Sequence, residues 1–349
     1  MKIYRYLIFM FIMLVTAEMQ AQQQVVFDEE KVFLQYQQQM SSGETQKAFN
    51  TLANWYKNTN KILPAMLLAE AYQTGIGTKV NIEQALILYK SVSDSQIPDD
   101  NEESKLIVSA CSRQYGILKM VHAGDATSES ISYLRQSVSL TEDAMALTIL
   151  GMLFLDEKKE DGIKYLARAA ERNSIIALEL LGEISASHEE MDQAIAYWEK
   201  AATTPIYYVA REEQHNSKLS FLVNPNLDIN SAVIEYQREA CIKLASIYYE
   251  MEEYTATTAL SWLSKIVQDD DRSLSLKAFC YARVGKMDDT RAIFMDLYNR
   301  TNDAEYLTNL GITEFYHGNK ESSKKYLQKA MSEGSQEAKE SYAEFFNNQ

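Results

Sequence analysis

The chain has 349 residues and a formal net charge of 34 − 49 = −15, and its residues are 46% apolar and 24% charged. This composition is typical of a globular protein and excludes a disordered chain. The chain holds only 12 glycines and 4 prolines, whereas average usage would give roughly 24 and 17. So few turn residues exclude a β-sandwich, a β-barrel or a loop-rich disulfide scaffold, and we expect an almost entirely helical protein.

The first 21 residues have the layout of a secretory signal peptide. Lys2 and Arg5 precede an uncharged apolar run at residues 6–15, and small residues follow it. The run is shorter than the roughly 20 apolar residues that span a hydrocarbon core. We expect cleavage after Ala21 or, alternatively, after Ala17, and export to a bacterial periplasm or to the outside of the cell. An uncleaved membrane tether is the other possible reading of this segment.

Charge restricts the partners of the mature chain. Loss of residues 1–21 would change the net charge to 32 − 48 = −16. A negative field of this size repels phosphate backbones and anionic lipid surfaces. We therefore expect no nucleic-acid partner. No second apolar run approaches spanning length, so we also expect no membrane insertion after cleavage, whereas the oligomeric state is not predicted.

A phrase of one small residue, followed four positions later by a large apolar residue, recurs in phase along the chain. A Leu-Gly or Leu-Ala pair precedes most copies by about 12 residues, and apolar residues within each segment follow helical spacing. Between copies the spacings are 45, 32, 32, 65, 31 and 33 residues, so the unit is close to 32–34 residues. The small residues are Ala85, Ser130, Gly162, Ala194, Ala259, Thr290 and Ser323, with an earlier copy at Ala48. This pattern predicts helix hairpins that stack side by side, because a single hairpin cannot bury its apolar face alone.

Two known repeat families share this pattern. The order Gly182, Ala194, Trp198 and Ala201 resembles the tetratricopeptide repeat, as does the copy from Gly311 to Ala330. Residues 64–92, with a Gly-x-Gly turn, resemble the related Sel1-like repeat. The resemblance covers most of residues 28–345 and implies an all-α, right-handed α-solenoid of about eight to nine hairpins over residues 22–349. It also implies a platform for protein partners without shared catalytic residues, so we do not expect an enzyme.

Three segments depart from the regular pattern. Residues 104–122 predict an unusually long first helix, and residues 203–238 lack both repeat phrases, so we expect this second segment to be irregular. Residues 336–346 read as a last helix with a polar outer side. Such a capping helix covers the apolar face that the last hairpin would otherwise expose.

The sequence offers little sign of chemistry. Cys111, Cys241 and Cys280 lie in apolar helical patterns and are expected to be buried thiols, although a Cys241–Cys280 bridge is an alternative. No HExxH, CxxC, GxSxG or glycine-rich phosphate loop occurs, so we expect no catalytic, metal or cofactor site. Residues 224–230 alternate Asn and Asp as a calcium loop does, but Ile229 stands where that loop needs Gly. We expect a polar turn there, ahead of a helix over residues 231–250.

In tetratricopeptide-like stacks, the first helix of each hairpin lines the concave side. Carrying the spacing over unit by unit predicts a groove with aromatic anchors and two carboxylates, suited to an extended or helical peptide. The groove residues are Met145, Thr148, Met152, Leu155, Glu179, Glu183, Ile242, Ser246, Tyr249, Ser275, Phe279, Thr308, Ile312 and Phe315. The chain then acts as an exported scaffold for a protein or peptide partner. The alternative is a structural or accessory subunit of a cell-envelope assembly that docks through its convex face or its chain ends.

Overall fold

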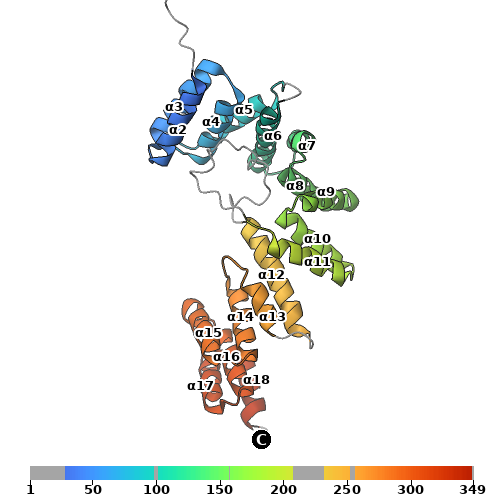
Figure 1. Ribbon diagram of the computed structural model, residues 1–349. Helices are drawn as coiled ribbons and strands as arrows, with labels where there is room; N and C mark the ends of the chain where they lie inside the picture. The colour runs from blue at the N-terminus through green and yellow to red at the C-terminus, as the bar shows by residue number, and fades with distance from the viewer. Residues whose placement is uncertain (1–27, 98–100, 157, 207–231, 252–255, 348–349) are drawn as a thin grey trace, which may run out of the picture. The chain divides into compact units, whose positions relative to one another are not determined.

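The computed structural model describes residues 28–97, 101–156, 158–206, 232–251 and 256–347. These residues form helices and no strand, and they belong to two compact units with a boundary between Thr141 and Glu142. Consecutive helices pair as antiparallel hairpins within each unit (Figure 1). This arrangement confirms the predicted all-α fold of stacked hairpins.

The N-terminal unit holds three hairpins. In each one, the two helices that follow each other along the chain pack together. The helices are α2 Glu29–Ser41, α3 Thr45–Thr59, α4 Ile62–Thr74, α5 Ile82–Ser93, α6 Glu102–Ala123 and α7 Ser128–Thr141.

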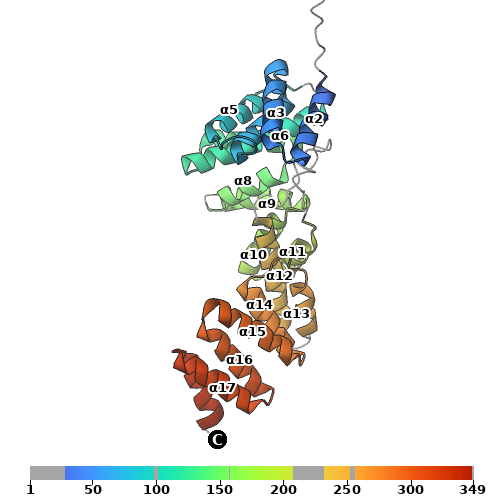
Figure 2. The ribbon, with the colours of Figure 1, turned by 90° about the vertical axis from the view of Figure 1, so that its left-hand side faces the viewer.

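In its described residues the C-terminal unit holds five hairpins and a closing helix. The hairpins pair α8 Ala144–Leu155 with α9 Lys159–Glu171, α10 Ile175–Ser187 with α11 Met191–Thr203, α12 Ala232–Glu250 with α13 Ala256–Leu263, α14 Asp271–Arg283 with α15 Met287–Thr301, and α16 Ala304–Tyr316 with α17 Lys320–Ser332. Figure 2 labels the helices of these hairpins, from α8 to α17. The chain then forms α18 Gln336–Tyr342 and a π-helical turn, η3 Ala343–Asn347.

The small residues of the repeat lie where the two helices of a hairpin come closest. All eight are buried, from Ala48 on α3 to Ser323 on α17. The Leu-Gly pair acts in the same way on the first helix: a Cβ on Gly182 would lie 2.4 Å from Nε1 of Trp198. A side chain at this position would push the indole away, so the repeat pattern reports close helix packing.

The Gly-x-Gly turn of the Sel1-like segment has a steric cause. Gly77 has φ +68°, a backbone conformation that residues with a Cβ rarely adopt. A Cβ there would also lie 2.1 Å from the carbonyl oxygen of Thr45, at the start of α3. The turn therefore packs directly on the preceding hairpin.

Some expectations need correction, and others fall outside the described residues. The sequence predicts both an irregular segment over 203–238 and a helix over 231–250, and the structure has the helix: α12 begins at Ala232, so residues 232–238 are helical and not irregular. The leader at 1–21 and the Asn/Asp segment at 224–230 lie outside the described residues. The predicted cap over 336–346 corresponds to α18 and η3.

The three cysteines are free and buried, as their apolar surroundings predict. The alternative Cys241–Cys280 bridge is therefore wrong for this structure. Burial raises the pKa of Cys241 to about 12 and that of Cys280 to about 11, so these thiols stay protonated and inert near neutral pH. Of the helices in the described ranges, none combines the length and apolar character needed to cross a bilayer.

Lys90 joins three helices of the N-terminal unit. Its Nζ donates to Oε1 of Glu129 at 2.7 Å and to the hydroxyl of Tyr133 at 3.0 Å. The hydroxyl of Tyr115 donates to the same Glu129 oxygen at 2.9 Å. These bonds, that of Lys90 first, lower the pKa of Glu129 from 4.5 to about 2. The contacts link α5, α6 and α7 through one carboxylate.

We expect this carboxylate to make the N-terminal unit sensitive to acid. The unfolded chain takes up the Glu129 proton near pH 4.5 and the folded chain only near pH 2, so the stabilisation is present above about pH 4.5 and is lost as pH falls through this window. Because the side chain is 41% exposed, Glu129→Gln should cost only about 1 kcal/mol at pH 6 and nearly nothing at pH 2. Urea unfolding at several pH values tests this. A variant at exposed Glu103 should keep the wild-type pH profile, and an unchanged profile for Glu129→Gln would contradict the prediction.

Candidate functional site

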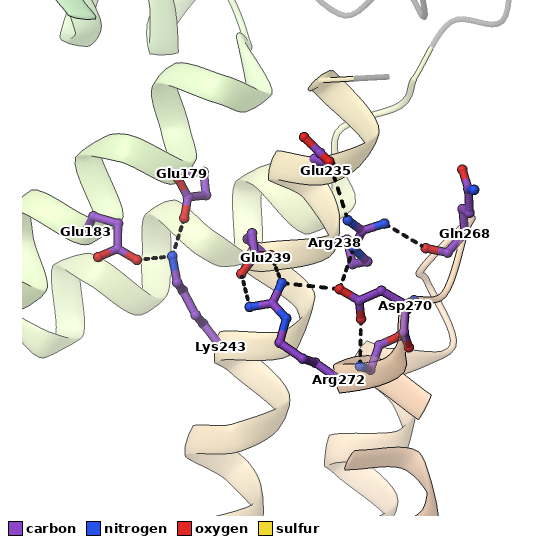
Figure 3. Close-up of polar contacts among 10 residues, drawn as sticks. Glu179, Glu183, Glu235, Arg238, Glu239, Lys243, Gln268, Asp270 and Arg272 are labelled. Carbon is purple, nitrogen blue, oxygen red and sulfur yellow. Dashed lines mark hydrogen bonds and ion pairs between the residues drawn. The ribbon is translucent and has the colours of Figure 1, made fainter. Parts of the chain in front are cut away.

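The first helices of neighbouring hairpins lie side by side in the C-terminal unit. The helix α12 contacts both α10 and α14, and these contacts run between first helices (Figure 1). We call the side chains that bridge these three helices, together with their exposed neighbours on α10 and α12, the first-helix surface. Ion pairs cross it from α10 to α14 (Figure 3).

Lys243 on α12 connects this helix to α10. Its ammonium group forms ion pairs with both Glu179 and Glu183, which are one helical turn apart (Figure 3). The ammonium also lies 5.4 Å from the ring centre of Trp198, within the range of a cation–π contact. Glu179 is only 3% exposed, whereas Glu183 reaches solvent.

Burial and neighbouring charges act in opposite directions on Glu179. Burial raises the pKa of its carboxyl group above 4.5, the bond from Lys243 lowers it, and the Glu239 carboxylate raises it again. The net direction is upward. Burial is the largest cause, so the Lys243 contact only partly offsets the cost of placing this carboxylate inside the stack.

Two arginines connect α12 to α14. Nε of Arg238 lies 3.3 Å from Oδ2 of Asp270, and its Nη1 donates to the carbonyl oxygen of Gln268 at 3.2 Å. Arg272 pairs with Glu239, and its Nη2 also lies 3.2 Å from Oδ2 of Asp270 (Figure 3). With these contacts, α12 is held ionically to the first helix on each side.

Asp270 has a second role as the N-cap of α14. Its side chain accepts from the backbone N–H of Ser273, and the Ser273 hydroxyl accepts from the backbone N–H of Asp270. Burial alone would raise the pKa of Asp270, but the Ser273 N–H, Arg238 and Arg272 outweigh it, and the net shift is downward. The cap therefore fixes the position of one carboxylate of the surface.

The predicted groove residues lie in several separate places. The structure brings Glu179 and Glu183 together through Lys243, and it places Ile242 and Tyr249 against one core cluster, and Ile312 and Phe315 against another. On α8, Met145 is half-buried and Met152 is 44% exposed, and on α12 Ser246 is half-buried.

The predicted aromatic anchors are half-buried, and each packs against a neighbouring side chain. The guanidinium of Arg283 lies 4.1 Å from the ring centre of Tyr249. Phe279 packs edge-on against Phe294, with ring centres 5.2 Å apart. Ile312 and Phe315 pack in the last core cluster, where Phe315 stacks on Phe345 at 3.9 Å.

Two of the other predicted groove positions are used inside the stack. Thr148 and Thr308 are buried, and each forms a hydrogen bond with the N-cap serine of the next first helix, Ser174 or Ser335. They tie hairpins together and do not line an open surface.

Sequence reasoning missed Lys243, Arg238, Glu239 and Arg272. One signal could have found part of this set: Glu179 and Glu183 are the only charged residues of α10, and they are spaced i, i+4 on an otherwise apolar helix. Glu239 and Lys243 have the same spacing on α12. Charged side chains at such spacing on first helices indicate contacts across repeats.

The arrangement suits recognition. Across the described ranges, no group of three or more His, Cys, Asp or Glu side chains could hold a metal ion. The carboxylates and cations of the first-helix surface form hydrogen bonds and ion pairs with one another. They can contact a partner's charged or polar groups without rearranging the helices.

The solved structures with similar folds are helical-repeat proteins. A Sel1 repeat protein from Oxalobacter formigenes matches with a TM-score of 0.52 and 15% identity, over 77% of this chain and 99% of its own. The fold is that of the Sel1-like and tetratricopeptide repeats. At this identity the likeness establishes the repeat fold alone. No protein-family model matches the sequence, and no curated protein matches it.

Two further repeat structures match with lower TM-scores. YrrB, a TPR protein with an unusual peptide-binding site, has a TM-score of 0.40 and 16% identity, over 59% of this chain and 96% of its own. A protective antigen of uropathogenic Escherichia coli strains, with an SLR fold, has a TM-score of 0.41 and 15% identity, over 86% of this chain and 58% of its own.

Proposed function

We propose that this protein is a non-enzymatic scaffold that binds a protein or peptide partner on its first-helix surface. The observation that carries the proposal is the row of ionic contacts that crosses α10, α12 and α14 (Figure 3). Side chains held in place before binding lose less conformational entropy when a partner arrives. Three successive hairpins also present their side chains at a regular spacing, so an extended partner can contact all of them.

A second candidate function is a structural role in a cell-envelope assembly, with docking through the chain end. The observation that favours it is the aromatic cluster formed by α16, α18 and η3. Tyr316 is 72% exposed and packs edge-on against Phe345, and half-buried Phe346 lies next to Phe315. Exposed aromatic side chains of this kind are enriched at protein interfaces.

We propose further that the protein works outside the cytoplasm. The support is the leader-like order of residues 1–21: basic residues, an apolar run and small residues. An exported chain would be recovered from the periplasm or the culture medium, with its N-terminus at Gln22 or, after cleavage at Ala17, at Glu18.

Site-specific photo-crosslinking in intact cells tests both location and surface. A photoreactive phenylalanine at Glu183 or Glu235, both exposed and on the first-helix surface, should give one discrete crosslinked product in the exported fraction. The matched control places the photoreactive phenylalanine at Asp192, which is exposed on the second helix α11. This position should give no crosslinked product. A fourth variant carries the photoreactive phenylalanine at Tyr316, and crosslinks from this position alone would favour the second candidate function. Equal amounts of product from all four positions would contradict the proposal.

A further inference from the structure

The two central first helices carry a surplus of acid. Together α10 and α12 contain five glutamates and two basic residues, a balance of 2 − 5 = −3. The second helices of the same hairpins, α11 and α13, contain two acidic residues and one basic residue, a balance of 1 − 2 = −1. The acid surplus therefore belongs to α10 and α12, whereas α14, the third helix of the surface, holds three basic residues and one acidic residue, a balance of 3 − 1 = +2.

On α10 and α12 the carboxylates of Glu183 and Glu235 are more exposed to solvent than the basic side chains. The two cations of these helices are largely covered: the side chain of Arg238 is 14% exposed and that of Lys243 is 26% exposed. The carboxylates of Glu183 and Glu235 are 49% and 63% exposed. On α14, exposed Arg272 is already paired with Glu239 and Asp270, and exposed Arg283 lies against the ring of Tyr249. The charge that α10 and α12 present to solvent is therefore negative.

An aromatic side chain lies on α12 directly after Glu235. Tyr236 on α12 is half-buried, and burial, followed by the nearby Glu179 and Glu235 carboxylates, raises the pKa of its hydroxyl group. A ring next to carboxylates is a favourable place for a cation, because the ring face and the carboxylates attract it together. Elsewhere on this helix, Lys243 already lies against Trp198.

We propose that the partner segment bound by the first-helix surface is basic, with Lys or Arg side chains that pair with Glu183 and Glu235 and contact Tyr236. This inference rests on the proposed function and names the chemistry of the partner. The carboxylates attract a cationic segment over distance and repel acidic competitors, which gives both rate and selectivity. The net charge of −15 on the whole chain favours the same class of partner.

A phage-displayed random-peptide library selected on the full chain tests the inference. The selected peptides should be enriched in Lys and Arg. Their dissociation constants, measured by fluorescence anisotropy, should rise at least about tenfold when NaCl increases from about 50 to about 500 mM. The double variant Glu183→Lys/Glu235→Lys should weaken binding by at least about tenfold, and Glu183→Gln/Glu235→Gln should weaken it less.

The matched control is Glu160→Lys/Asp192→Lys, which changes the net charge by the same amount on the second helices α9 and α11, at exposed positions. It should leave the dissociation constants within about twofold, because both changed residues lie on second helices, outside the first-helix surface, and salt screens exposed charges that do not contact the partner. Circular dichroism of each variant confirms that it is folded.

The outcomes separate this inference from the proposed function. The selected peptides could instead be neutral or acidic and bind the wild-type chain but neither Glu183/Glu235 double variant. This result would overturn the basic-partner inference and leave the first-helix surface as the binding site. Peptides that bind equally to the charge-reversed variant, or the absence of any selected peptide, would overturn both.

Discussion

Replacing Arg291 with methionine should lower the free energy of unfolding of the C-terminal unit by about 3 kcal/mol. The carboxylate of Glu314 on α16 is fully buried and pairs with Nε and Nη2 of Arg291 on α15, the latter at 3.1 Å. Without the guanidinium, the carboxylate keeps the bond from Nδ2 of Asn319 at 2.7 Å. The effect is at the low end for a buried pair, because the Arg291 side chain is 33% exposed.

The matched control lies on the same helix. Arg300 pairs with Asp296 at 3.0 Å and with Asp271 at 3.1 Å, but its side chain is 47% exposed. Arg300→Met should therefore cost less than about 1 kcal/mol. The double variant Arg291→Met/Glu314→Leu should recover most of the loss, because it removes the buried charge. Equal urea midpoints for Arg291→Met and Arg300→Met would contradict the prediction, because the buried ion pair would then contribute no more to the free energy of unfolding than the exposed one.

The hairpins were predictable because their pattern has a steric origin. Gly182 opposite Trp198, and Gly311 opposite Leu327, leave no room for a side chain. Such contacts connect residues 15 or 16 positions apart within one hairpin, so their spacing along the chain is nearly constant and can be read from a single sequence. The predicted long helix is likewise present as α6.

The contacts between repeats were less predictable. Lys243 lies 64 residues after its partner Glu179, and this separation spans the segment without repeat phrases. Phe315 has the spacing of a groove residue, but the chain returns after α18 and covers it with Phe345. Which first-helix side chains stay open depends on how the hairpins stack, and this is not encoded by the spacing of one repeat.

The division into two units has no counterpart in the repeat spacing. Ser130 and Gly162 are 32 residues apart across the boundary at Thr141 and Glu142, like neighbours within a unit. The sequence therefore predicts one continuous array, whereas contacts within the structure group the helices into two cores. The division into two units depends on contacts between hairpins, and the small and large residues of the repeat motif do not predict these contacts.

Phe294→Ala should destabilise the C-terminal unit by about 3–5 kcal/mol and leave the N-terminal unit protected. Phe294 is fully buried and packs in one cluster with Ala278, Leu297 and Leu310, on three successive helices. Alanine would leave a cavity between hairpins, where each repeat depends on its neighbour. Hydrogen exchange read by mass spectrometry should show lost amide protection in α14–α16 and none in α2–α7.

Leu52 gives the reciprocal experiment, because it occupies the same repeat position on α3 as Phe294 does on α15. It is 1% exposed and belongs to the core of the N-terminal unit. Leu52→Ala should cost about 2–5 kcal/mol and lower amide protection only in α2–α7. If each variant instead lowered protection over both units equally, the two cores would unfold as one cooperative structure. The first-helix surface would then depend on the stability of the N-terminal hairpins as well as on that of the C-terminal hairpins that carry it.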